Sequence, residues 1–166
     1  PPEKAWHAFL SHHWDNQDAV HTIKRQLQRL LPGVRAFLDV DDLEDVADLE
    51  AHIRQSAAVL VYLGSERYFS SANCLRELAA AAATPLVRVW DVKAPPLDEL
   101  RSACDAHAAK HLDLCPIESR ERALDADVVP WCRVREFQLV ALAAIAEQLL
   151  SACDAEPASL RVAGTL

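Results

Sequence analysis

The sequence predicts an α/β domain in which five parallel strands, in the order 2-1-3-4-5, form a sheet with helices on both faces. Short apolar runs rich in branched residues alternate with helical stripes along most of the 166 residues. Such runs are typical of strands buried on both faces, and their alternation with helices favours a parallel sheet with right-handed crossovers. The length is enough for one domain with a substantial core.

The first half of the chain predicts two strands and two helices. The run at 6–10 is a first strand, and a loop from Ser11 to Asn16 follows it. A stripe of apolar residues then predicts a helix that Pro32-Gly33 ends. A second strand is expected at 34–38, and an acidic loop leads to a short helix that contains Leu49 and Ile53, one turn apart.

The second half continues the alternation. The run at 57–63 predicts a strand that Gly64 ends in a sharp turn, before a polar loop and an alanine-rich helix. The closing helix is expected to bury Phe137, Val140, Ala141, Ala144, Ile145 and Leu149. The other expected segments are a strand at 85–90, short helices at 97–109 and 119–124, an edge strand at 128–132 that contains Pro130, the closing helix at 135–150 and a tail at 151–166. These segments form one domain, 1–150, with 151–166 as a tail or linker, in a flavodoxin-like three-layer sandwich.

Composition narrows the class of function. Half of the residues are hydrophobic, a quarter are charged, and the formal net charge is −8. This balance argues against non-specific binding to nucleic acid or to an anionic membrane surface. We recognise no secretory signal, and the most apolar stretch, 137–150, is short for a membrane span and contains Glu147. The expected location is cytoplasmic.

The five cysteines are odd in number, which favours reduced thiols. Cys104, His107, His111 and Cys115 recur at helical spacing and resemble a metal-binding box. On one continuous helix the first and last of them would lie about 16 Å apart at ~1.5 Å per residue, too far to share one ion. We therefore expect a partly exposed helix face and no metal.

The candidate active carboxylate, Glu77, follows the third predicted strand. Ser71 or Asn73 can cap the helix that begins there, which places Glu77 in or just after the first turn. The positive end of a helix favours an ionised carboxylate, and the carboxyl ends of strands one and three are where sheets of this order bind ligands. The alternative is an acid that only complements the helix dipole.

Four segments, in order and at the right spacing, resemble the Toll/interleukin receptor (TIR) domain family. The segment 9–13, Phe-Leu-Ser-His-His, is similar to the first-strand box, and 37–44 resembles the second strand with its BB loop. The segment 68–78 resembles the third box, Tyr-x-x-Ser-x-x-Cys-Leu-x-Glu-Leu, of the type that carries a catalytic glutamate. Trp131 and Glu136-Phe137 are like the fifth strand and the last helix.

The resemblance implies an activity. Many TIR domains with this glutamate hydrolyse NAD+ at the bond between nicotinamide and ribose, and Glu77 falls on its position. NAD+ would then be the substrate, with no bound cofactor, and the partners would be other TIR domains. The resemblance also implies a set of residues that surround the ribose and nicotinamide or lie in the loops that hold them. These residues are Ser11, His12, His13, Asp39, Glu44, Asn73, Cys74 and Arg76.

Other functions stay open at this stage. The BB loop has Asp45-Val46-Ala47 where many members have a glycine, and no phosphate-cradling glycine loop exists among only three glycines. A domain that acts only as an adaptor by pairing with other TIR domains is therefore the alternative. A phosphoacceptor receiver domain with Asp39 as acceptor is a third, although it would need an acidic pair after strand one and a lysine after strand five, where this chain has 11–13 (Ser-His-His) and Arg133.

Overall fold

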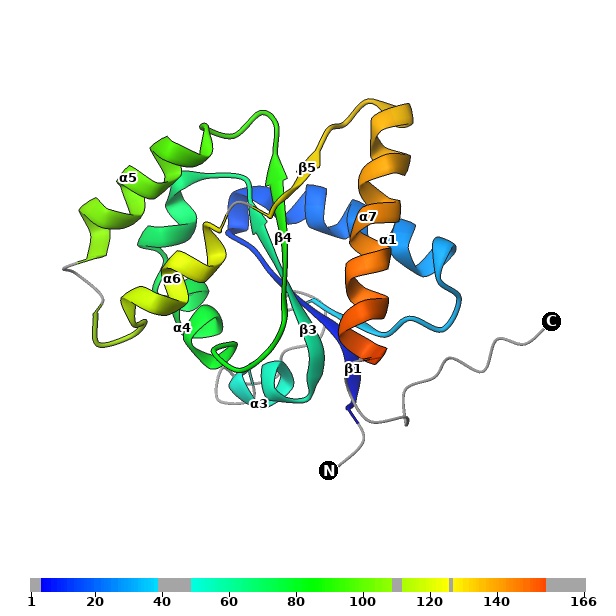
Figure 1. Ribbon diagram of the computed structural model, residues 1–166, viewed down its shortest axis with the longest axis horizontal. Coiled ribbons are helices and arrows are strands. Elements are labelled where there is room, and N and C mark those ends of the chain that lie inside the picture. Colours follow the sequence, from blue (N-terminus) through cyan, green and yellow to red (C-terminus); the bar gives the residue numbers. More distant parts are fainter. Residues whose placement is uncertain (1–3, 39–48, 109–111, 126, 155–166) are drawn as a thin grey trace.

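A computed structural model of the chain describes residues 4–38, 49–108, 112–125 and 127–154. Its core is one sheet of parallel strands in the order β2-β1-β3-β4-β5, as the sequence predicts. The strands are β1 (Trp6–Ser11), β2 (Ala36–Phe37), β3 (Ser56–Leu63), β4 (Leu86–Asp91) and β5 (Val129–Trp131). Their carboxyl ends lie along the upper edge in Figure 1.

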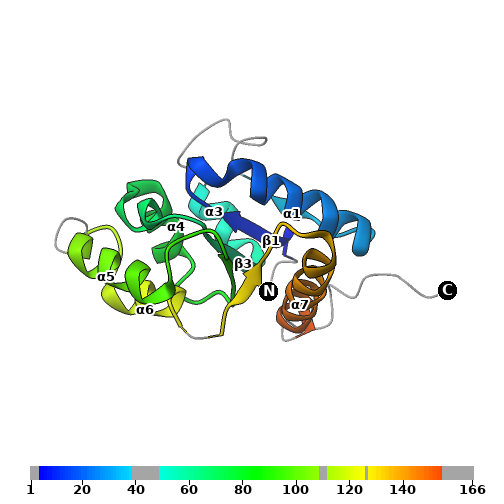
Figure 2. The same ribbon diagram turned by 90° about the horizontal axis from the view of Figure 1, so that it is seen from above.

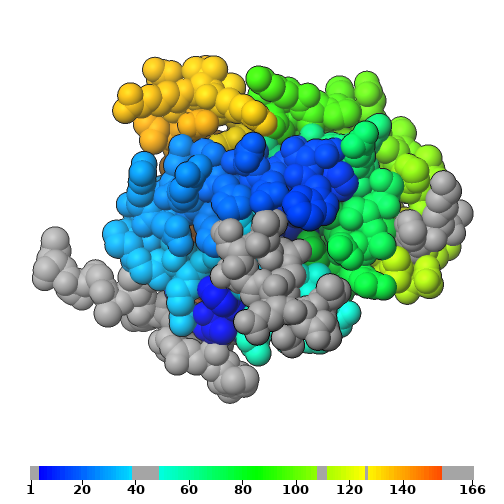
Figure 3. Space-filling view, turned by 180° about the vertical axis from the view of Figure 1, so that it is seen from behind, coloured from blue at the N-terminus to red at the C-terminus, as the bar shows by residue number. Residues whose placement is uncertain are grey.

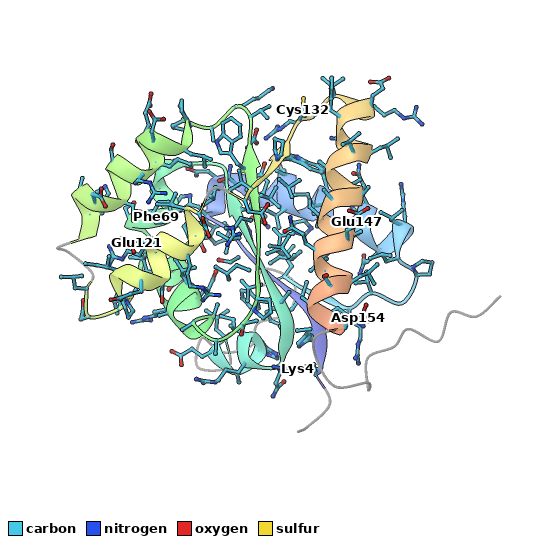
Figure 4. The ribbon with its side chains drawn as sticks, in the orientation of Figure 1. Lys4, Phe69, Glu121, Cys132, Glu147 and Asp154 are labelled. Atoms are coloured by element: carbon cyan, nitrogen blue, oxygen red, sulfur yellow. The ribbon has the colours of Figure 1, made fainter. Side chains whose placement is uncertain are left out.

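Helices cover both faces of the sheet (Figures 1 and 2). The helical elements are η1 (Trp14–Asn16), α1 (Gln17–Leu30), α3 (Leu49–Arg54), η3 (Glu66–Ser70), α4 (Ala72–Ala80), α5 (Leu97–Ala108), α6 (Ile117–Ala123) and α7 (Arg135–Asp154). An apolar cluster lies between the sheet and each helical layer. α1 and α7 pack against the sheet in the first cluster, and α3 to α6 pack against it in the second. Glu147 on α7 and Glu121 on α6 mark the two opposite layers in Figure 4.

Most predicted segments are confirmed within one or two residues. β3 is buried at all eight positions, which explains its unbroken apolar run. β2 is shorter than predicted, with two residues, and β1 extends one residue further, through Ser11. β5 pairs only with β4, so the edge position indicated by Pro130 is confirmed.

The closing helix differs most from its prediction. α7 runs on to Asp154, four residues past the predicted end, so residues 151–154, which were expected in the tail, are helical. Phe137 and Val140 were expected inside, but they are 62% and 70% exposed. The buried arc is Ala141, Leu142, Ile145, Ala146, Leu149 and Ala152. The first turns of α7, which carry the exposed Phe137 and Val140, project beyond the end of β5 (Figure 1).

α7 is also the one helix among the described residues that is long and apolar enough to cross a membrane by length and composition alone. This finding differs from the sequence prediction, which judged the segment too short. The buried arc of α7 packs against the sheet in the first apolar cluster. Of the apolar window within α7, 33% is buried inside the domain.

Glycine occupies two positions, 33 and 64, for different physical reasons. Gly33, just after α1, has φ of 91°, a left-handed conformation that other residues rarely adopt, and it ends the helix as predicted. Gly64 does not have a positive φ, so the predicted sharp turn is not its reason. A Cβ atom at Gly64 would lie 2.5 Å from Asn16 Nδ2 and 2.6 Å from Tyr62 Cε1, so space alone requires glycine there.

Candidate active site

The predicted active carboxylate lies on α4. Ser71 is the N-cap, and its side chain accepts a hydrogen bond from the Cys74 N–H, which confirms one of the two predicted caps. Glu77 is the sixth residue of the helix and therefore lies in its second turn. The Glu77 side chain is turned inward, with 3% of the residue exposed. The Glu77 carboxylate is therefore buried inside the domain. It is not an exposed acid that only complements the helix dipole.

Two buried hydroxyl groups meet at this carboxylate. Ser11 Oγ donates a hydrogen bond of 2.5 Å to Glu77 Oε2, and the same Oγ lies 2.6 Å from the Tyr68 hydroxyl oxygen. Ser11 is the last residue of β1, and Tyr68 lies on η3. Both residues are at most 1% exposed. The strand end, the short 3-10 helix and α4 therefore converge on one carboxylate at the carboxyl edge of the sheet.

Ser11 differs from its predicted role. The resemblance placed it in a loop that faces the substrate, but Ser11 pairs with Val61 in the sheet. Its side chain is buried and directed to Glu77. In this structure Ser11 therefore lies at the end of β1 and contacts the carboxylate, and its contact with substrate stays a prediction.

The two histidines after Ser11 lie beside this site. His12 Nδ1 is 3.2 Å from the Leu10 carbonyl oxygen, which selects the tautomer with a proton on Nδ1. Burial lowers the pKa of His12, against the raising effect of that bond, so the ring is neutral at pH 7. His13 caps η1 by accepting a bond from the Asp15 N–H. A neutral His12 offers no fixed charge to a pyrophosphate.

An ion pair ties this segment to η3. Arg67 Nη1 lies 3.0 Å from Asp15 Oδ2, and the two side chains are 66% and 49% exposed. In the space-filling view the blue segment after β1 lies against the green segment that carries η3 and α4 (Figure 3). An exposed pair of this kind adds little stability. It does join the two segments that supply Ser11 and Tyr68.

The remaining predicted residues divide into three groups. Cys74 is buried, and its thiol donates to the His12 carbonyl oxygen at 3.4 Å, which joins α4 to the segment after β1. Asn73 and Arg76 are exposed on α4. Asp39 and Glu44, with the BB loop, lie outside the described residues. The structure therefore brings together Ser11, Cys74 and Glu77 from the predicted set.

The suspected metal box is not one helix. α5 ends at Ala108, and Cys115 lies in a turn before α6. His111 lies outside the described residues, and the described part of the chain holds no group of three or more His, Cys, Asp or Glu side chains that could bind a metal ion. Burial raises the pKa of Cys104 to about 11, so its thiol is protonated at neutral pH.

Sequence reasoning missed the role of Tyr68. The residue was noted only as the first position of the third box, and nothing local indicates that its hydroxyl contacts Ser11, 57 residues away. The available signal was a pair of aromatic residues, Tyr68 and Phe69, within a polar loop, since a buried tyrosine hydroxyl usually finds a partner.

The fold and the site define a class of protein: a doubly wound α/β domain with a buried carboxylate at the carboxyl edge of its parallel sheet. Residues 8–126 match the family model described as TIR domain. The chain therefore belongs to the TIR domain family.

Solved structures of low identity share the fold. The chain is similar to the TIR domain of the Toll-related receptor TRR-2 from Hydra magnipapillata, with a TM-score of 0.59 and 12% identity over 88% of this chain and 99% of that one. It is also similar to the TIR domains of the activated Roq1 resistosome, which directly recognises the pathogen effector XopQ, with a TM-score of 0.50 and 19% identity over 86% and 84% of the two chains. No curated protein matches the chain.

Proposed function

We propose that this domain is an NAD+ nucleosidase that acts in cytoplasmic innate-immune or cell-death signalling. The observation that carries the proposal is the Glu77 carboxylate, which is buried at the carboxyl edge of the sheet and held by the Ser11 hydroxyl at 2.5 Å. The family includes NAD+ hydrolases, and ligands bind at this edge in doubly wound sheets.

The reaction suits one carboxylate. The bond between ribose C1′ and the pyridinium nitrogen breaks, and its electron pair leaves with nicotinamide, which becomes neutral and needs no general acid. Positive charge develops at C1′, and Glu77 stabilises it as in glycoside hydrolysis. Water then forms the new C1′–O bond and loses a proton, which gives ADP-ribose; attack by a group of the same molecule gives a cyclic variant.

The burial of Glu77 sets a condition on this activity. With 3% of the residue exposed, substrate reaches the carboxylate only after neighbouring groups move. We infer that association with a second TIR domain supplies that rearrangement, so the free domain is nearly inactive. The formal net charge of −8 on each copy opposes association, and salt therefore raises specific activity.

The test is nicotinamide release from NAD+, followed by liquid chromatography across a series of protein concentrations. Glu77→Gln is expected to lose activity by about 10²–10³-fold while the domain stays folded. Glu147→Gln makes the same chemical change at an exposed position of α7, in the opposite layer, and is expected to keep full activity. Wild-type turnover in Glu77→Gln would contradict the proposal.

The second candidate is an adaptor that only associates with other TIR domains. The observation in its favour is the same burial of Glu77, since a carboxylate that substrate cannot reach is what a domain without catalytic activity would have. The concentration series distinguishes the two. Specific activity that rises with concentration supports the assembled enzyme, whereas self-association in light scattering without turnover at any concentration supports the adaptor.

A further inference from the structure

Three side chains from three elements form one buried chain of hydrogen bonds. Tyr68 is 0% exposed, Ser11 is 1% exposed and Glu77 is 3% exposed. The Tyr68 hydroxyl lies 2.6 Å from Ser11 Oγ, which lies 2.5 Å from Glu77 Oε2. These hydrogen bonds therefore connect the Tyr68 hydroxyl to Glu77 through Ser11.

Proton counting fixes the direction of the chain. An ionised carboxylate only accepts hydrogen bonds, so the single Ser11 hydroxyl proton goes to Glu77. Ser11 Oγ then has only lone pairs for Tyr68, which must donate. Burial, followed by the neighbouring Cys74 and Glu77, holds the pKa of Tyr68 well above its usual value, so the phenol keeps the proton that it donates.

The ring and the hydroxyl of Tyr68 have separate tasks. The ring packs in the second apolar cluster, edge-on to Phe69 at 5.3 Å between centroids. That packing needs no hydroxyl, and a phenylalanine would preserve it. The hydroxyl instead fixes the orientation of the Ser11 side chain. A serine that accepts a hydrogen bond from Tyr68 keeps its single hydroxyl proton for the Glu77 carboxylate.

We propose that Tyr68 is a positioning residue for Glu77, acting through Ser11. The inference rests on the proposed function and deepens it. The chain from Tyr68 to Ser11 fixes Oε2 before substrate arrives, so the carboxylate does not reorient as positive charge develops. Such preorganised groups in a buried site contribute more than mobile ones, and hydrogen bonds to a charged acceptor are the stronger kind.

Tyr68→Phe removes only the hydroxyl. Expected is a fall in kcat of about tenfold with KM changed less than about twofold, because the substrate contacts stay while the carboxylate loses its fixed orientation. Tyr62→Phe is the matched control: Tyr62 is also 0% exposed, and its hydroxyl donates to Asp91 Oδ2 at 2.6 Å, away from Glu77. Its kcat is expected to equal that of the wild type.

A double-mutant cycle tests the relay itself. In the Ser11→Ala background, Tyr68→Phe is expected to lower kcat no further. The urea midpoint of unfolding is a second readout of the same cycle, and it can be measured even if the domain has no enzymatic activity. Tyr68→Phe is expected to lower the midpoint in the wild type but not in Ser11→Ala, where the phenol has lost its acceptor. Tyr62→Phe lowers it equally in both backgrounds.

The outcomes separate the two proposals. Wild-type kcat in Tyr68→Phe, with Glu77→Gln inactive, overturns the positioning role and keeps the enzyme. Additive urea midpoints overturn the relay whatever the activity. Non-additive midpoints without turnover in any variant, at any protein concentration, support the hydrogen-bond chain and refute the proposed function.

Discussion

Arg122 on α6 binds the turn that ends α4, the helix of Glu77. Its Nη1 donates to the carbonyl oxygens of Ala81 at 3.2 Å and Ala82 at 2.7 Å, and its Nη2 donates to Thr84 at 2.9 Å. The last carbonyl groups of a helix lack partners within it, and a cation beside them is favourable. One side chain therefore closes this helix end.

Arg122→Ala removes all three bonds. At about 1 kcal/mol net for each, and with the site partly open to solvent, the free energy of unfolding is expected to fall by about 2–4 kcal/mol. Arg122→Lys keeps the charge but loses the planar group that reaches several carbonyls, so an intermediate loss is expected.

The assay is urea unfolding followed by tryptophan fluorescence, with amide hydrogen exchange as the local readout. Exchange of the Ala81 N–H, which is bonded to the Glu77 carbonyl oxygen, is expected to accelerate in Arg122→Ala. Arg25→Ala changes an exposed arginine on α1 and is expected to alter stability by less than about 0.5 kcal/mol. If both variants lie within that limit of the wild type, the three contacts do not hold the turn and the reasoning fails.

Three further predictions use the same unfolding assay. Gly64→Ala is expected to cost about 1–3 kcal/mol, because its Cβ has no room; wild-type stability would show that the neighbouring side chains move freely. Burial lowers the pKa of both His7 and His12, so protonation favours the unfolded chain and stability is lost as the pH falls below about 6.5; replacing either by Asn flattens that profile, and an unchanged slope would refute this origin. Val140→Ala is expected to cost under about 0.5 kcal/mol and Ile145→Ala about 2–4 kcal/mol; equal costs would mean that the assigned helix face is wrong.

The strand order and nearly all elements could be predicted because their signals are local. The seven-residue apolar run at 57–63 indicates burial on both faces, and β3 contains this run. The alternation of strands with helices then restricts the topology. The buried face of α7 was only partly predictable. Phe137 and Ile145 are both apolar, and which of them is buried depends on how far the sheet extends along the helix.

The candidate site was predictable in one part. The cap at Ser71 and the position of Glu77 follow from neighbouring residues. The direction of Ser11 and the partner of Tyr68 do not, since these contacts join positions 57 and 66 residues apart. A one-residue shift in the pairing register of β1 against β3 would turn Ser11 to the opposite face of the sheet, and the sequence of the strand does not fix that register by itself.

The distance along the chain between Ser11 and Glu77 also bears on where a gene fragment of this domain can begin. A product that starts at Gln17 would keep α4, its serine cap and the glutamate. It would lack β1, the central strand between β2 and β3, and with it the donor to the carboxylate. A cloning junction placed after Ser11 therefore yields a product in which Glu77 lacks the hydrogen bond from the Ser11 hydroxyl.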